Sequence, residues 1–273
     1  MVCQEKIYER GKIMCKQPKS VFITGASSGI GKELALAYAN PDMTLFLCGR
    51  NIDRLNQTAA ACRNKGATVY LHQFDVRDAE AAQNAIQESV KICPIDLLIA
   101  NAGVSAGVLG MDETPVSTRT IFETNIFGVI NTVLPAIEAM KAQHQGHIAI
   151  VSSLSGYRGM SSCPAYSSSK SCVKAWGEAL WGSLKPHNIN VTVICPGFIE
   201  TPLTDKNQFK MPFLMKAPKA AQIIKKRLKR RPPIIAFPWI MAFGAWFGSI
   251  LPARIILPIL GRLPKKESSA EMK

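Results

Sequence analysis

Short segments rich in β-branched and aromatic residues alternate along the chain with longer segments of helical periodicity. The short segments are predicted to be strands: Ser20–Thr24, Thr44–Cys48, Thr68–Phe74, Asp96–Ala100, His147–Ser152, Asn190–Cys195 and Ile234–Phe237. Helices are expected between them: Lys32–Asn40, Asp53–Lys65, Ala79–Lys91, Thr118–Lys141, a helix that ends at Leu184, and Pro218–Arg231. This alternation predicts an α/β fold with a single doubly wound parallel sheet and helices on both faces.

The residues that follow the expected strands are mostly glycine, small polar or charged. In an open parallel sheet, a ligand binds at the carboxyl ends of the strands, near the point where the strand order reverses. The residues at these ends are Gly25–Gly31, Gly49-Arg50, Asp75, Asn101–Gly103, Ser152-Ser153 and Pro196–Thr201. We therefore expect one ligand site that draws on nearly every strand.

The first of these segments, Thr24-Gly25-Ala26-Ser27-Ser28-Gly29-Ile30-Gly31, joins a strand to a helix. Its glycines let the backbone turn tightly and approach a pyrophosphate, whose charge then meets the free N–H groups of the following helix. The spacing differs from G-x-G-x-x-G, so the loop is predicted to be a variant dinucleotide-binding motif. The alternative is a glycine-rich turn that binds no ligand.

Arg50 follows the second expected strand, where the ribose of a dinucleotide is recognised. An acidic residue at this place would accept from both ribose hydroxyls and repel a 2′-phosphate, whereas arginine pairs with a phosphate in bidentate fashion. The sequence therefore predicts that NADP(H) is preferred, with NAD(H) possible. The alternative is that Arg50 is a surface cation.

Tyr166 and Lys170 lie four residues apart in the helix expected after the fifth strand, and therefore on one helix face. The ammonium group would favour the phenolate and lower the pKa of Tyr166 toward neutrality. Ser153 stands at the end of the preceding strand, and a loop could return its hydroxyl to the same site. The alternative is a solvated helix face.

Several motifs occur together and in order, and their combination resembles the short-chain dehydrogenase/reductase family over about residues 18–202. They are the loop Thr24–Gly31, Asn101-Ala102-Gly103, Asn125, Ser153, Tyr166-x-x-x-Lys170 and Pro196-Gly197. The resemblance implies a Rossmann-type catalytic domain over residues 18–237, with a substrate lid at about residues 201–217. Residues 1–17 would be a lead-in and residues 238–273 an apolar C-terminal segment with a basic tail.

The resemblance also implies a role for each matching residue. Tyr166 would be the acid or base at the substrate oxygen, and Ser153 would donate a hydrogen bond to that oxygen. Lys170 would hold the nicotinamide ribose and lower the Tyr166 pKa, and Asn125 would anchor a water in a proton relay. The remaining cofactor contacts are expected from Gly25, Ser27, Ser28, Gly29, Ile30 and Gly31 at the diphosphate, Asp75 and Val76 at the adenine, Asn101, Ala102 and Gly103 at its ribose, and Ile199 and Thr201 at the carboxamide, together with Pro196 and Gly197.

The composition narrows the class of protein. A chain of 273 residues that is 47% hydrophobic has enough apolar residues for one large domain and is not typical of disorder. The eight cysteines form no C-x-x-C pair, and the four histidines show no ligand spacing with them. We therefore expect reduced thiols, no metal site and a cytoplasmic setting. Residues 1–17 lack the apolar core of a secretory signal.

The net charge of +14 is concentrated in the C-terminal part, where residues 205–273 hold fifteen Lys and Arg but three Asp and Glu. A long apolar run follows the basic cluster Lys225–Arg231, and Pro238 and Pro252 interrupt it. A helix or hairpin that lies on the cytoplasmic face of a membrane is therefore favoured over a full span. A subunit interface or a wall of the substrate channel is the alternative for residues 232–263, and residues 264–273 are expected to be disordered.

The combined hypothesis is an NADP(H)-dependent oxidoreductase that interconverts a ketone and a secondary alcohol by hydride transfer. Apolar residues in the expected lid, including Phe209, Met211 and Phe213, favour a lipophilic, lipid- or steroid-like substrate. The family resemblance implies a homodimer or homotetramer, and nucleic acid is not expected as a partner because no groove-reading motif accompanies the charge. The alternative function is a non-catalytic NADP-binding, membrane-associated adaptor or redox sensor that retains the fold.

Overall fold

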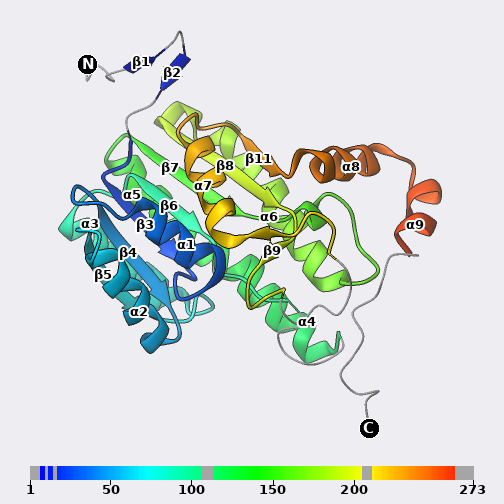
Figure 1. The fold of residues 1–273 in the computed structure, drawn as a ribbon, viewed down its shortest axis with the longest axis horizontal. Helices are drawn as coiled ribbons and strands as arrows, with labels where there is room; N and C mark the ends of the chain where they lie inside the picture. Colours follow the sequence, from blue (N-terminus) through cyan, green and yellow to red (C-terminus); the bar gives the residue numbers. More distant parts are fainter. Residues whose placement is uncertain (1–6, 10–11, 15–16, 106–112, 205–210, 262–273) are drawn as a thin grey trace.

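The computed structural model describes residues 7–9, 12–14, 17–105, 113–204 and 211–261. Within them, the centre of the molecule is a seven-stranded parallel sheet with the order β11-β8-β7-β6-β3-β4-β5 (Figure 1). Its strands are β3 (Ser20–Thr24), β4 (Thr44–Gly49), β5 (Thr68–Gln73), β6 (Leu97–Ala100), β7 (Gly146–Val151), β8 (Ile189–Pro196) and β11 (Ile234–Phe237). The prediction of a doubly wound parallel sheet is confirmed.

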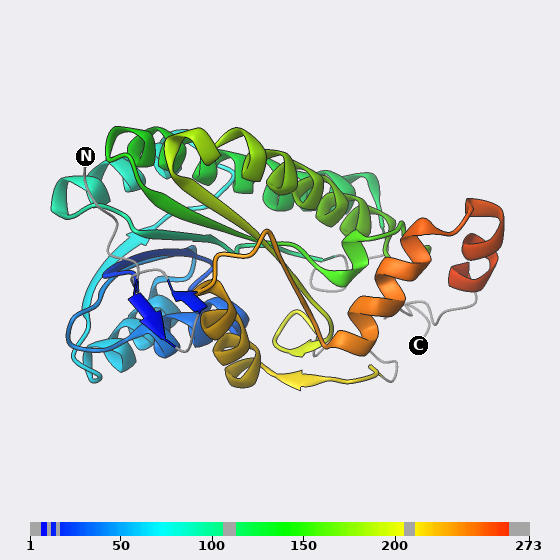
Figure 2. The ribbon, with the colours of Figure 1, turned by 90° about the horizontal axis from the view of Figure 1, so that it is seen from above.

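Helices cover both faces of this sheet (Figure 2). They are α1 (Gly29–Tyr38), α2 (Ile52–Arg63) and α7 (Ala217–Leu228) on one face, and α3 (Ala79–Ile92), α5 (Gly128–Ala142) and α6 (Pro164–Ser183) on the other. The central residues of β3 show why the strands are rich in apolar residues: Val21 and Ile23 enter the core on the α1, α2 and α7 face, and Phe22 enters the core on the α3, α5 and α6 face.

The strand order reverses beside β3, and this reversal creates the ligand crevice. The chain runs outward from β3 through β4 to β5, and then returns to β6 on the other side of β3. The segments that leave β3 and β6 therefore diverge at the carboxyl edge of the sheet, which is where ligands bind in open α/β folds. The glycine loop after β3 and Asn101–Gly103 after β6 lie at this edge.

Local differences from the expected elements occur at three places. The long helix expected over Thr118–Lys141 is divided into α4 (Pro115–Phe122), the π-helical turn η2 (Glu123–Phe127) and α5. A hairpin of β1 (Ile7–Glu9) and β2 (Lys12–Met14) lies within the expected lead-in. Strand β9 (Ile199–Glu200), just before the expected lid, pairs in parallel with β10 (Met215–Lys216) near the end of that lid.

The short strand pair β9–β10 could not be predicted from two-residue segments, which show no periodicity. Within the expected lid, residues 205–210, including Phe209, lie outside the described residues, as do residues 262–273.

The chain after β11 forms two apolar helices, α8 (Trp239–Ile250) and α9 (Ala253–Gly261), which extend from one end of the molecule (Figures 1 and 2). Helix α8 spans about 18 Å at 1.5 Å per residue, less than the roughly 30 Å hydrocarbon core of a bilayer. Among the described residues, Pro115–Ala142 is long and apolar enough to cross a membrane, but half of its most apolar window is buried inside the domain. That stretch contains α5, whose buried side chains belong to the core against the sheet.

Candidate functional site

A cavity of about 1,050 Å³ opens at the carboxyl edge of the sheet. It is bounded by the ends of β3, β4, β6, β7 and β8, by the start of α6 and by one side of α8. The residues predicted from the sequence that line it are Gly25, Ser27, Ser28, Gly29, Ile30, Arg50, Asp75, Val76, Asn101, Ala102, Gly103, Ser153, Tyr166, Lys170, Pro196, Gly197, Ile199 and Thr201. Gly31 and Asn125 do not line the cavity, and both lie behind its wall.

The glycine loop forms one end of the cavity. Gly25 and Gly29 have φ of +67° and +53°, in the left-handed region that side chains disfavour. A Cβ on Gly31 would collide with the carbonyl oxygen of Gly25, so the third glycine permits the close packing of loop and helix. Helix α1 begins here without a side-chain cap from Ser28, and its first N–H groups and positive dipole end suit an anion.

Asn101 and Thr24 hold this loop against the neighbouring strand. The Asn101 side-chain amide donates to the Thr24 carbonyl at 3.0 Å, and the Thr24 hydroxyl accepts from the Asn101 backbone N–H at 3.0 Å. Asn101 therefore braces the loop in addition to lining the cavity.

Arginine side chains gather at the rim, where β4 ends. The Arg50 guanidinium is 61% exposed and lies 3.6 Å from a carboxylate oxygen of Asp75. Burial alone would raise the Asp75 pKa, but hydrogen bonds and charge from Arg77, with a smaller effect of Arg50, hold it below its usual value. Arg54 from the first turn of α2 also lines the cavity, so this end is cationic.

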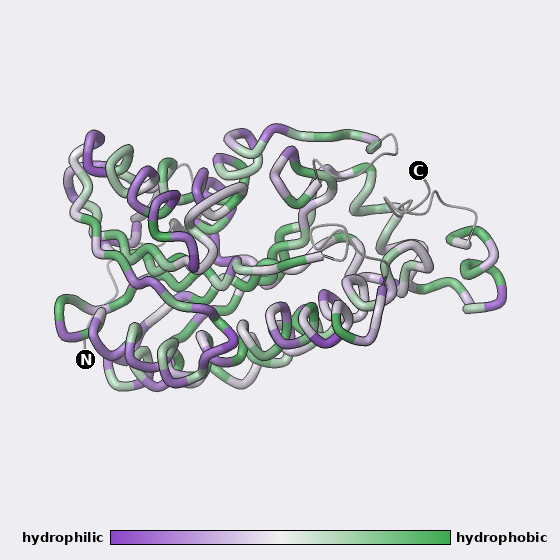
Figure 3. Tube along the Cα trace, turned by 90° about the horizontal axis from the view of Figure 1, so that it is seen from below, coloured by the Kyte–Doolittle hydropathy of each residue, from purple (hydrophilic) through white to green (hydrophobic). Residues whose placement is uncertain are grey.

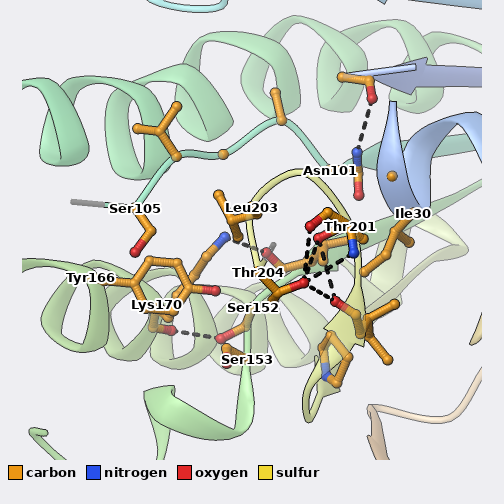
Figure 4. A pocket seen from close by; sticks show the side chains of 18 of the residues that line it. Ile30, Asn101, Ser105, Ser152, Ser153, Tyr166, Lys170, Thr201, Leu203 and Thr204 are labelled. Carbon is orange, nitrogen blue, oxygen red and sulfur yellow. Dashed lines mark hydrogen bonds between the residues drawn. The ribbon is translucent and has the colours of Figure 1, made fainter. Parts of the chain in front are cut away.

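Ser153, Tyr166 and Lys170 meet midway along the cavity (Figure 4). Helix α6 starts at Pro164 and places Tyr166 and Lys170 on one face, with the Lys170 ammonium 5.8 Å from the centre of the Tyr166 ring. The Ser153 hydroxyl lies close enough to the Tyr166 hydroxyl to lower its pKa. The Lys170 ammonium donates to the Val151 carbonyl at 3.0 Å. The structure thus brings together the three side chains that the sequence placed in one site.

Asn125 lies one layer behind this cluster, in the π-helical turn η2, and is fully buried. Its amide oxygen accepts from the Val104 N–H at 2.8 Å, and its amide nitrogen donates to the Val104 carbonyl and the Ser169 hydroxyl. A Cβ on Gly103 would lie 3.1 Å from Asn125 Oδ1 and 3.3 Å from Lys170 Nζ. Gly103 therefore separates the two side chains, and the proton relay through Asn125 stays a prediction.

Comparison with known proteins agrees with this geometry. The family model for short chain dehydrogenases matches residues 19–211. An uncharacterized oxidoreductase of Myxococcus xanthus is 34% identical over 236 residues, which cover 86% of this chain and 93% of that protein. The chain belongs to the short-chain dehydrogenase family. It is an NAD(P)-dependent oxidoreductase of that family.

This short-chain dehydrogenase is also similar to an animal protein and to a protein of known structure. Dehydrogenase/reductase SDR family member 7B of Bos taurus is 36% identical over 193 residues, or 67% of this chain, and the match spans 59% of that protein's length. The crystal structure of a short chain dehydrogenase from Mycobacterium paratuberculosis bound to NAD superimposes with a TM-score of 0.72 at 20% identity. It covers 82% of this chain and 97% of that chain, and it shows the same fold.

The expectation that Lys170 lowers the Tyr166 pKa is wrong for this structure. Burial dominates and raises the pKa of Tyr166 to about 12, although the nearby Ser153 hydroxyl acts in the opposite direction. Burial also lowers the pKa of Lys170 to about 8, and its ammonium points at a carbonyl and not at the phenol oxygen. Tyr166 is therefore a neutral phenol at pH 7, which is the form that donates a proton.

The residues of the cavity fit a dinucleotide. The uncapped α1 terminus and the glycine loop suit a diphosphate, and the arginines suit further phosphate charge. Among the described residues, the hydroxyl of Thr124 is the single buried side-chain polar atom without a hydrogen-bond partner. Thr124 lines the cavity, so a bound polar group could satisfy a hydroxyl that is costly to leave unpaired.

Sequence reasoning missed the wall of the cavity that lies opposite the glycine loop. Met160 and Cys163 belong to the loop before α6, and their position between Ser153 and Tyr166 was a signal that could have identified them. Met241, Gly244 and Ala245 come from α8, which the sequence offered only as one of several alternatives for the apolar run. The structure thus assigns one side of α8 to the cavity.

Proposed function

We propose that this short-chain dehydrogenase is an NADP(H)-dependent oxidoreductase that interconverts a lipophilic ketone and the corresponding secondary alcohol. The observation that carries the proposal is the position of Ser153, Tyr166 and Lys170 in the cavity, between the glycine loop and an apolar wall. A cofactor site and a substrate site that share one acid–base cluster are what coupled hydride and proton transfer requires.

The cofactor would be held by groups at the carboxyl edge of the sheet. The α1 terminus and the glycine loop would bind the diphosphate, and Arg50 and Arg54 would bind a 2′-phosphate through charge-assisted hydrogen bonds. When bound, the cofactor supplies or accepts the hydride. Preference for NADP(H) is supported by the absence of an acidic side chain at residues 49–51, directly after β4.

The protein residues would move the proton and stabilise the reacting oxygen. Ser153, 8% exposed, would donate a hydrogen bond to the substrate oxygen and keep it next to the Tyr166 hydroxyl. The neutral Tyr166 phenol would donate its proton during reduction and recover it during oxidation. Lys170, 3% exposed, would link α6 to the end of β7 through the hydrogen bond from its ammonium to the Val151 carbonyl, and so help to position Tyr166.

The wall opposite the glycine loop supports a lipophilic substrate. Its side chains are apolar or small: Leu154, Met160, Phe198, Leu203, Pro212, Met241, Gly244, Ala245 and Leu260. Ligand pockets of this kind gain most of their affinity from apolar burial, with few polar groups to orient the ligand. Methionines adapt to irregular shapes, which suits flexible or polycyclic hydrocarbons.

The test is NADPH consumption by the purified full chain with a panel of long-chain keto lipids and steroid ketones. Wild-type turnover is expected, and Tyr166→Phe should lower kcat by about 10²–10⁴-fold, the usual contribution of a positioned general acid. Tyr70→Phe is the matched control, because Tyr70 is exposed on β5 and does not line the cavity. NADPH binding measured by calorimetry should be similar in all three proteins.

Two outcomes would contradict the proposal. Unchanged turnover in Tyr166→Phe would remove Tyr166 from the reaction. Tight NADPH binding by the wild type without turnover of any ketone or alcohol would favour the adaptor or sensor function over the enzyme.

A further inference from the structure

Helix α8 has two different faces. Met241, Gly244 and Ala245 line the cavity, and α8 packs against η3 (Leu154–Gly156) and β11. The opposite face consists of large apolar side chains that are 46–74% exposed: Trp239, Ile240, Phe243, Trp246, Phe247 and Ile250. The helix that closes the cavity therefore presents a row of aromatic residues outward.

Helix α9 extends this exposed apolar surface. Ile256 is buried against α8, where it lies next to Gly248. Ile255, Leu257 and Ile259 are 50–55% exposed. Figure 3 shows hydrophobic colouring along both helices at this end of the molecule. Contiguous apolar surface of this kind marks an interaction site, unlike single exposed side chains.

The segment of the chain that contains α8 and α9 carries charge of one sign. The sequence from residue 206 to residue 266 contains fourteen Lys and Arg and no Asp or Glu. Arg254 is exposed on α9, and the Arg158 guanidinium donates to the Ser249 carbonyl near the end of α8 at 3.2 Å. The cluster Lys225–Arg231, which the sequence placed beside the apolar run, lies at the other end of β11, so within the described part of the chain Arg158 and Arg254 are the cations noted beside this surface.

We propose that the outward face of α8 and α9 docks on an anionic lipid bilayer, with α8 lying in the interfacial region. Tryptophan and phenylalanine partition into this region, and arginine side chains reach anionic headgroups. The length of α8 permits docking but not spanning. If the substrate is lipophilic, which rests on the proposed function, it enters the cavity from the bilayer past α8.

A second copy of this chain is the less suitable occupant. A two-fold symmetric contact would place the same surface on both sides of the interface. It would bring Arg254 and Arg158 toward their own copies, and nearby like charges oppose association. An anionic membrane supplies the opposite charge and the apolar layer together.

Sedimentation of the purified full chain with vesicles tests the proposal. We compare vesicles of phosphatidylcholine with phosphatidylserine and vesicles of phosphatidylcholine alone. The test variant carries Trp239→Ser and Phe243→Ser, whose side chains are 74% and 59% exposed and do not line the cavity. The matched control carries Leu134→Ser and Trp181→Ser, which are exposed on α5 and α6. Point variants are used because a deletion from residue 232 would also remove strand β11.

The wild type and the control are expected to sediment with the anionic vesicles. The test variant should partition at least about tenfold less, since burial of one large apolar side chain corresponds to a factor of ten or more. Arg254→Glu should weaken binding to anionic vesicles and leave binding to neutral vesicles little changed. NADPH affinity reports that each variant is folded.

Wild-type protein that stays in solution with anionic vesicles would overturn the proposal, as would equal partitioning of the test variant and the control. Light scattering without vesicles identifies the competing occupant. The surface is a contact between copies of the chain if two results occur together. The wild type would then not sediment with vesicles, and the variant with Trp239→Ser and Phe243→Ser would be a monomer where the wild type is a dimer. Vesicle binding requires no turnover, so these outcomes are independent of the enzymatic test.

Discussion

The Ser152 hydroxyl donates a 2.7 Å hydrogen bond to the backbone carbonyl of Lys170. Ser152 directly precedes Ser153 at the end of β7, and Lys170 lies one turn after Tyr166 on α6. This bond therefore links the strand and the helix that carry the acid–base cluster. Gly156 permits the approach, since a Cβ there would lie 2.9 Å from Ser152 Oγ and 2.8 Å from the Lys170 carbonyl.

Ser152→Ala should lower kcat by roughly tenfold to a hundredfold, because small displacements of reacting groups have effects of that size. The KM for the cofactor should change little, since Ser152 acts by positioning its neighbours, and the thermal midpoint should fall because a buried hydrogen bond is lost. Ser168→Ala is the control, as its exposed hydroxyl bonds only to carbonyls of its own helix. A wild-type kcat in Ser152→Ala would show that the link is dispensable.

The depressed pKa of Lys170 predicts a rise in stability with pH. Its folded pKa of about 8 lies below the ordinary value of 10.5, so between these values the unfolded chain binds more protons than the native chain. The free energy of unfolding therefore increases from about pH 8 to 10.5. Tyr166, with its pKa raised to about 12 from 10.0, lowers stability above pH 10.

Denaturant titrations of wild type and Lys170→Met at pH 7.5 and pH 10 measure this effect. The wild type should gain about 2 kcal/mol over Lys170→Met across this interval, because one pKa unit corresponds to about 1.4 kcal/mol. Lys219→Met, which removes an exposed lysine on α7, should keep the wild-type profile. A constant difference between wild type and Lys170→Met would mean that Lys170 keeps an ordinary pKa.

The position of Arg50 at the rim of the cavity predicts a preference for NADP(H) over NAD(H). Arg50→Ser should weaken NADPH binding by roughly tenfold to a hundredfold, the range expected when a charge-assisted hydrogen bond is lost, and should leave NADH binding nearly unchanged. Asp75 keeps its 2.8 Å ion pair with Arg77, so the rim of the cavity should stay intact. Calorimetric titration with both cofactors makes the measurement, and Arg119→Ser on α4 is the control. An equal loss for NADH, or tighter NADH than NADPH binding by the wild type, would refute the argument.

A larger side chain at Gly244 should narrow the part of the cavity that is lined by α8. A Cβ on Gly244 meets nothing within 4 Å, although the residue lines the cavity. Gly244→Leu should therefore fold, raise the KM for bulky ketones by about tenfold or more and spare small ones, with NADPH affinity retained. Gly182→Leu is matched, because Gly182 is also helical and open but lies outside the cavity. Equal kinetics of the two variants toward bulky ketones would remove α8 from the substrate site.

Features that depend on neighbouring residues in the sequence, such as strand bounds and shared helix faces, were predicted well. Strand β3 has the expected bounds because its β-branched and aromatic residues stop at Gly25. Tyr166 and Lys170 share a face because the helical repeat dictates it. Their electrostatics could not be predicted in the same way, because the direction of the Lys170 ammonium depends on Val151, a residue of another element.

Elements whose form depends on distant contacts were not predicted. The π-helical turn at Asn125 adds a residue to a helix whose apolar periodicity is otherwise continuous, so composition carries no signal for it. Helix α8 is largely apolar on both faces, so hydropathy alone does not tell which face turns toward the cavity and which toward solvent. The packing of Met241 and Ala245 against Leu154 and its neighbours identifies the face toward the cavity.

The cavity is built from two separate parts of the chain, and this has a consequence for protein engineering and for the evolution of substrate range. The glycine loop, the arginine rim and the acid–base cluster lie within residues 19–211, whereas the α8 wall comes from beyond them. The C-terminal segment after β11 can thus be exchanged between related enzymes without changing the residues proposed to bind the cofactor. Substrate range could diversify by replacement of the last two helices, while the reaction itself stays constant.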